Sequence, residues 1–177
     1  MPSFCCGTSV GGRVRRTTPD GKDKDQATYE TAMREEADEE LGLKVLHATE
    51  LTTVHLPNLC SAAPTDPPGH LWTVFDLEVV PGARLLPDAE ETRGAEWVDR
   101  GRLTAMADAT IDFARTGRPA AEQPADSLEA VWVELLHRIG DLTVCEDDRD
   151  AVRRLYTTAP PEYWSGGRPM NGGHDSP

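Results

Sequence analysis

Three glutamates near the end of a predicted helix are the residues whose type and spacing point most directly to chemistry. Glu36 is followed at i+3 by Glu39 and at i+4 by Glu40, and residues at these spacings share one face of a helix. Like charges so placed destabilise a bare helix by roughly 0.2–0.5 kcal/mol per pair, and the negative end of the helix dipole adds to the cost. Mg²⁺ and Mn²⁺ prefer carboxylate oxygens and would offset this repulsion.

A solvated acidic face is the alternative interpretation of the same glutamates. Acidic helices are common, and Arg34 lies at i±4 from both Glu30 and Asp38, so that it can pair with either. Spacing alone therefore leaves both a metal site and an ordinary surface open.

Composition excludes several classes of protein. The 177 residues are 38% hydrophobic and 28% charged, which is typical of a globular chain of one domain. The net charge of −13 disfavours binding to a nucleic acid backbone. We find no apolar run of membrane-spanning length and no signal peptide, and therefore expect a cytoplasmic protein that binds no membrane. The spacing of the four cysteines matches no zinc site. Reduced thiols are expected, because cytoplasmic proteins rarely form disulfides.

Two other patterns, paired histidines and a phosphate-binding loop, are missing from the sequence. The five histidines are scattered and form no H-x-x-x-H or H-E-x-x-H pair. Gly11-Gly12 is not followed by the G-K-[ST] of a phosphate-binding loop. The glutamates are therefore the leading candidates for a site.

Helices and strands are predicted to mix irregularly along the chain. Residues 27–41 are strong helix formers with a thin apolar stripe, and Gly42 stands where a helix cap is expected. This mixture favours a mixed-sheet α/β/α arrangement over a doubly wound parallel sheet. The predicted strands cover 4–10, 43–56, 71–80 and 95–98, and the predicted helices cover 27–41, 100–116, 127–139 and 147–156.

The segment around the glutamates resembles the Nudix hydrolase family. Its motif reads G-x5-E-x7-R-E-U-x-E-E-x-G-U, where U is a bulky aliphatic residue. Residues 39–43, EELGL, match the end of this motif, and Glu36 falls on its first metal-ligand glutamate. The resemblance implies that Glu36, Glu39 and Glu40 bind Mg²⁺ or Mn²⁺ and carry the catalysis.

The sequence also departs from that motif. Glu35 stands where the family has arginine, Ala37 at the aliphatic position and Ala27 at the upstream glutamate. Gly21 has the correct spacing for the opening glycine. Gly12 is the rival, because SVGGRV is similar to the turn that precedes the motif, and the residues after it would then include an insertion within 13–26.

The later part of the chain is also similar to the family. GHLWTVFDLEVVPG is followed by an acidic loop and then by GAEWVDRGRL, so the resemblance covers roughly residues 5–115. In the family an acidic residue of this loop often supplies a further metal ligand or a general base. The resemblance implies that Glu90 is the further ligand and that Glu91 is a catalytic residue.

A Nudix-type α/β/α sandwich with a mixed sheet, followed by C-terminal helices, is the fold that we expect. Residues 1–120 would form this Nudix-like domain and residues 121–163 a helical extension packing on it, with 164–177 a disordered tail. The helix around Trp132 is expected to pack on the domain, and a homodimer surface is the alternative for it.

The predicted function is metal-dependent hydrolysis of a nucleoside diphosphate linked to another group. The partner is a small phosphorylated, nucleotide-derived substrate, and the segments unmatched to the family would set its identity. The alternative is a Nudix-like ligand-binding or regulatory module without hydrolysis, motivated by the departures in the motif. An isomerase acting on an allylic diphosphate is the third hypothesis.

Overall fold

The computed structural model describes residues 5–6, 26–59, 67–89, 95–158, 164–165 and 168–169. The described chain is a mixture of helices and antiparallel strands, so the predicted mixed α and β class is confirmed. Its elements in order are β1 (Cys5–Cys6), α1 (Gln26–Leu41), β2 (Val45–Leu56), β3 (His70–Val79), β4 (Trp97–Val98), α2 (Arg100–Arg115), η1 (Ala120–Glu122), α3 (Ala130–Arg138), α4 (Glu146–Tyr156), β5 (Trp164–Ser165) and β6 (Arg168–Pro169).

Helix α1 ends where its sequence predicts. Gly42 adopts a φ of 65°, a conformation that costs a residue with a Cβ about 1–2 kcal/mol. The N–H of Gly42 donates to the carbonyl of Asp38 at 2.9 Å, and that of Leu43 donates to Ala37, also at 2.9 Å. These bonds satisfy carbonyls that the helix end would otherwise leave unpaired.

Strands β2 and β3 form a long antiparallel hairpin. The register runs from Val45 opposite Val79 to Leu56 opposite His70, with irregularities at two places in β2. Both predicted strands are confirmed with small shifts of their ends. Within the described residues this sheet has two strands, so the coarse fold class is established and the larger mixed sheet is not.

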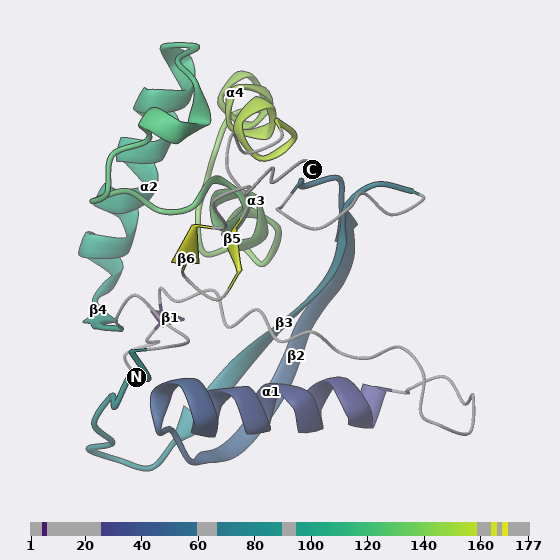
Figure 1. Ribbon diagram of the computed structural model, residues 1–177, viewed down its shortest axis with the longest axis vertical. Helices are drawn as coiled ribbons and strands as arrows, with labels where there is room; N and C mark the ends of the chain where they lie inside the picture. Colours follow the sequence, from purple (N-terminus) through teal and green to yellow (C-terminus); the bar gives the residue numbers. More distant parts are fainter. Residues whose placement is uncertain are drawn as a thin grey trace, which may run out of the picture.

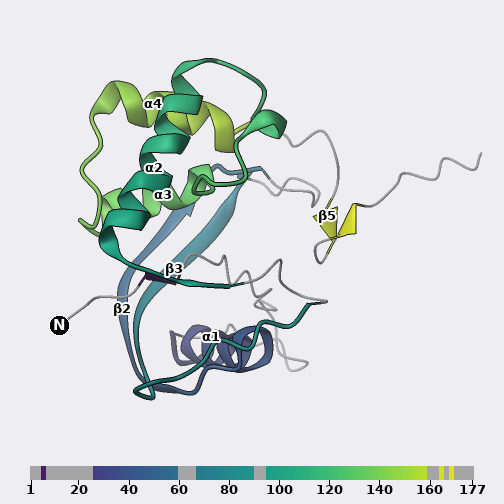
Figure 2. The same cartoon turned by 90° about the vertical axis from the view of Figure 1, so that its left-hand side faces the viewer.

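The two faces of the hairpin pack against different helices. In β3, Trp72 and Val74 face one side and Val79 the other, because side chains alternate along a strand. Trp72 and Val74 join the core formed with α2, α3 and α4. Val79 packs instead against the small cluster formed around α1. Figures 1 and 2 show α1 at one end of the hairpin and the other helices at the opposite end.

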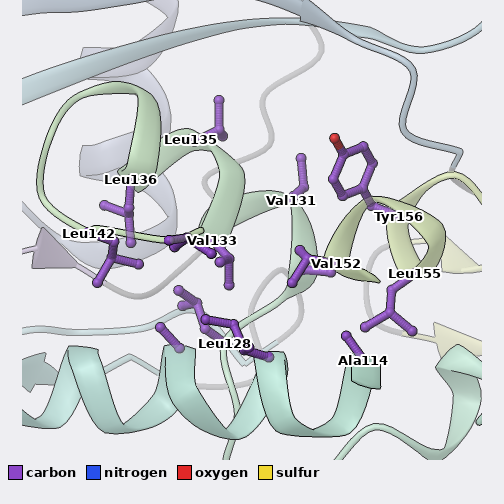
Figure 3. Packing of buried hydrophobic residues seen from close by; sticks show 14 of the residues in the cluster. Ala114, Leu128, Val131, Val133, Leu135, Leu136, Leu142, Val152, Leu155 and Tyr156 are labelled. Carbon is purple, nitrogen blue, oxygen red and sulfur yellow. The ribbon is translucent and has the colours of Figure 1, made fainter. Parts of the chain in front are cut away.

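Helices α2, α3 and α4 share one hydrophobic core with the end of the hairpin. Asp99 caps α2 by accepting a hydrogen bond from the N–H of Arg102 at 2.7 Å. Arg115 of α2 then grips both carboxylate oxygens of Asp148 in α4, at 2.7 and 2.8 Å. Figure 3 shows the centre of this core, which includes Ala114, Leu128, Val131, Val133, Leu135, Leu136, Leu142, Val152, Leu155 and Tyr156.

This core crosses the domain boundary predicted at residue 120. Helix α2 lies in the predicted domain 1–120, whereas α3 and α4 lie in the predicted extension 121–163, and all three contribute buried residues to one cluster. The extension therefore packs mainly on α2 and on the far end of the hairpin. The division into two parts stays a prediction.

The chain termini are described only in part. Cys5–Cys6 pairs antiparallel with Trp97–Val98, and the rest of the predicted strand 4–10 lies outside the described residues. In the predicted tail 164–177, residues 164–165 pair with 168–169, and the other residues lie outside the described part. Among the described residues, no helix combines the length and the apolar character needed to cross a membrane.

Candidate functional site

The three glutamates lie on the last two turns of α1, beside a narrow buried face. Ala37 and Leu41 are each only 2% exposed and fix which side of the helix faces the hairpin. Glu36 and Glu40 are half-buried at the edge of that face, and Glu39 is exposed. At 100° per residue, Glu36 points between the directions of Glu39 and Glu40, so the helix presents all three on one flank.

The cationic side chains near α1 form ion pairs on the other flank of the helix. Arg34 donates from Nε to Oε1 of Glu30 at 2.8 Å, which confirms one of the two pairings predicted for it. Lys44 pairs with Asp38. None of the ion pairs seen among the described residues includes Glu36 or Glu39. Glu36 and Glu39 therefore have no ion-pair partner among the described residues, although they lie near the negative end of the helix dipole.

The three carboxylates do not converge on one point. In the part of the chain that the structure describes, no group of three His, Cys, Asp or Glu side chains is placed to hold a metal ion. Mg²⁺ usually keeps several water ligands and binds through one or two carboxylates and the phosphates of its substrate. The oxygen donors of Glu36 and Glu40, at i and i+4 on one flank, fit that mode of binding.

The acidic loop begins against the end of α1. The N–H of Leu86 donates to the carbonyl of Leu41 and that of Asp88 to the carbonyl of Glu40, both at 2.9 Å. These bonds pair the last carbonyls of the helix and hold Asp88 beside the turn that carries Glu40. Glu90 and Glu91, the loop residues assigned from the resemblance, lie outside the described residues.

Gly42 allows this loop to approach so closely. A Cβ on Gly42 would lie 3.0 Å from the Cβ of Leu86. A contact of this length is tighter than nine in ten real Cβ contacts, so with a larger residue Leu86 would have to move by a few tenths of an ångström. The glycine thus has two roles, which are the helix cap and the docking of the acidic loop.

A polar and aromatic cluster at the other end of the hairpin was missed by the sequence interpretation. Asn58 is 8% exposed, and its Oδ1 accepts a hydrogen bond from Trp72 Nε1 at 2.9 Å. Trp72 also makes edge contacts with Trp132 and His70, with ring centroids 6.0 and 6.4 Å apart. Burial, and then the charge of His55, lower the pKa of His70. Of this cluster, only the packing of the helix around Trp132 on the domain was predicted from the sequence.

Comparison with known proteins gives no relative for this chain. No family model, no curated protein and no solved structure matches it. The case for a function therefore depends on the geometry of α1 and its loop and on the sequence pattern that they carry.

Proposed function

We propose that this chain is a Nudix-type hydrolase that cleaves a nucleoside diphosphate linked to another group, with Mg²⁺ or Mn²⁺ bound at α1. The observation that carries the proposal is the join between α1 and the loop after β3. A glycine-capped helix presents glutamates on one flank, and the N–H of Asp88 is bonded to the carbonyl of Glu40. The described start of the loop, up to Asp88, thus lies against the helix end that carries Glu40.

A Nudix-type sandwich is the proposed form of the fold. Its support is the layering of the described residues, in which α1 packs on one face of the β2–β3 hairpin and helices α2, α3 and α4 on the other. Opposite coverage of the two faces is what an α/β/α arrangement requires. The proposed mixed sheet needs strands beyond this hairpin.

Each glutamate has a role in the proposed reaction. Glu36, Glu39 and Glu40, with Glu90 from the loop, would hold the metal ions. A bound metal ion neutralises phosphate charge and lowers the pKa of a coordinated water. The helix holds the carboxylates at fixed rotation, which positions the phosphates for attack. Glu40 or Glu91 would accept the proton of the attacking water.

Conversion of the glutamates to glutamines tests this assignment. Glu39→Gln and Glu40→Gln should each reduce metal-dependent turnover by at least ~10²-fold, because a metal ligand or a general base is removed. The assay measures hydrolysis of a panel of nucleoside diphosphate derivatives with Mg²⁺ and Mn²⁺. Asp38→Asn is the matched control, since Asp38 lies on the same helix but pairs with Lys44. Unchanged turnover in both glutamine variants would overturn the assignment.

A binding module without hydrolysis is the second candidate, and one observation favours it. Glu35 replaces the arginine of the motif. The neighbouring Arg34 is engaged with Glu30 and with the carbonyl of Val45, not with the glutamate flank. A module of this kind would bind nucleotide or metal in calorimetry and turn over no compound of the panel.

A further inference from the structure

Helix α1 is attached to the hairpin through a small apolar contact. Its buried residues are Ala37 and Leu41, joined by Leu43 just beyond the helix end. Ala37 is small, so Leu41 is the one large side chain that the helix itself buries in this contact among the described residues. Polar bonds therefore share in fixing the direction in which the glutamate flank points, and those of Leu86 and Asp88 act only at the end of the helix.

Arg34 makes a polar bond between α1 and β2. Its Nη1 donates to the carbonyl of Val45, the first residue of β2, at 2.7 Å. Its Nε and Nη2 both lie 2.8 Å from Oε1 of Glu30, one turn earlier on the helix. The guanidinium is planar and rigid, and it bonds to Glu30 and to the strand through different N–H groups.

A small roll of α1 would displace the carboxylates by a distance that matters. Side chains extend about 5–6 Å from a helix axis, so a roll of about 10° moves their ends by about 1 Å. A displacement of about 1 Å can reduce catalysis by about 10²-fold. Arg34 points away from the glutamate flank, and its influence on that flank can act only through the rotation of the helix.

We propose that Arg34 is a positioning residue, which fixes the rotation of α1 through its bond to the Val45 carbonyl and so sets the metal-binding geometry of Glu36 and Glu40. This inference rests on the proposed function. The bond between Arg34 and the strand fixes the rotation of α1, because the pair of Arg34 with Glu30 lies within one helix and cannot do so.

Three variants separate these contributions. Arg34→Gln removes the bond to β2, whereas Glu30→Gln keeps an acceptor for the guanidinium and leaves that bond in place. Arg118→Gln is the control for loss of a helix-surface arginine, since Arg118 pairs with Glu122 far from α1. Mn²⁺ affinity is measured by electron paramagnetic resonance, and kcat and KM on any substrate that the panel identifies. Arg34→Gln should weaken Mn²⁺ binding by roughly 10-fold and lower kcat similarly, and the other two variants should change neither.

The Mn²⁺ dissociation constant distinguishes positioning from simple destabilisation. Partial unfolding would lower the active fraction and leave the affinity of the folded molecules unchanged. Equal Mn²⁺ affinities in Arg34→Gln and Arg118→Gln would overturn the inference about Arg34. The proposed function would still stand if the wild-type protein hydrolysed a compound of the panel. Equal losses of Mn²⁺ affinity in Arg34→Gln and Glu30→Gln would also overturn the inference about Arg34. A wild-type protein that neither binds Mn²⁺ nor hydrolyses any compound would overturn the proposed function, and the inference with it.

Discussion

Glu134 is the most deeply buried carboxylate among the described residues, and two arginines hold it. Its side chain is 5% exposed. Oε1 accepts from Arg138 at 2.7 Å and from Arg149 at 2.9 Å, and Oε2 accepts from Arg149 at 3.1 Å. Burial raises the pKa of Glu134, but the hydrogen bonds and charges of Arg149 and Arg138 outweigh it, and the pKa lies below its usual value. The carboxylate therefore ties α3 to α4.

Replacing this carboxylate should cost stability in a pH-dependent way. Glu134→Gln should lower the free energy of unfolding at pH 7 by about 2 kcal/mol, the range of hydrogen bonds to charged groups. Because the folded pKa is depressed, the contribution is complete above the unfolded pKa of roughly 4.3 and is lost as the pH falls through the folded pKa. The difference in free energy of unfolding between the wild type and Glu134→Gln should therefore become smaller below about pH 4.

Urea unfolding at a series of pH values measures that difference. Glu122→Gln is the control, because Glu122 forms an exposed pair with Arg118 and such pairs contribute little. An equal loss of unfolding free energy in both variants would contradict the role given to the buried carboxylate. A loss in Glu134→Gln that does not change with pH would contradict it as well.

Interactions of single residues could be predicted from sequence only where they are local. The bond between Arg34 and Glu30 spans four positions of one helix, so helical geometry alone indicates it. Glu134 and Arg149 are fifteen positions apart, and they meet only because α3 packs on α4. Asn58 carries no signal of burial in sequence, since its acceptor role depends on where Trp72 lies across the hairpin.

Elements were predictable where local preference and packing agree. Helix α1 and its cap follow from strong helix formers and a glycine, and the site glutamates follow with them. Helix α3 begins at Ala130, later than the predicted start at Ser127. The reason is tertiary, because the carbonyl of Leu128, which a helix from Ser127 would pair with the N–H of Trp132, accepts instead from Thr110 Oγ1 in α2. That contact holds the preceding residues outside the helix.

The cap of α1 allows a test at the scale of an element. Gly42→Ala should destabilise the protein more than Gly117→Ala, although the two glycines have nearly equal φ angles of 65° and 68°. The strained backbone costs each variant about 1–2 kcal/mol. Only Gly42 adds a contact, because its Cβ would meet Leu86 at 3.0 Å whereas nothing lies within 4 Å at Gly117.

Thermal unfolding and metal affinity together report on this cap. The melting temperature should fall further for Gly42→Ala, and Mn²⁺ binding should weaken only in that variant, because the acidic loop is displaced from Glu40. Identical melting temperatures would show that Leu86 moves aside without cost. The close approach of the loop would then have no structural importance.

At the scale of the whole molecule, the hairpin connects two clusters that contact its opposite faces. An isolated two-stranded hairpin is marginally stable in water, so the packing at its two ends must hold it. The strands themselves could be predicted from their β-prone composition. Which helix covers which face could not, because that depends on contacts between residues distant in sequence. The larger sheet proposed for the fold would also depend on contacts between residues distant in sequence.

Leu56 is the residue by which the hairpin is anchored in the larger core. It is 2% exposed and belongs to the cluster formed by α2, α3 and α4. Leu46 lies on the same strand but is 55% exposed. Leu56→Ala should lower the free energy of unfolding by about 2–5 kcal/mol, whereas Leu46→Ala should change it by no more than about 0.5 kcal/mol. The same substitution at two positions of one strand thus isolates the effect of docking.

Tryptophan fluorescence and far-ultraviolet circular dichroism follow this unfolding independently. Trp72 and Trp132 are in contact where β3 meets α3, so their emission reports on the junction, while dichroism reports mainly on the helices. In the wild type the two transitions should coincide, because one core joins hairpin and helices. In Leu56→Ala the fluorescence transition should shift to lower denaturant with the dichroism transition. A hairpin that undocks while the helices stay folded would separate the two curves and show that the core is not a single cooperative unit.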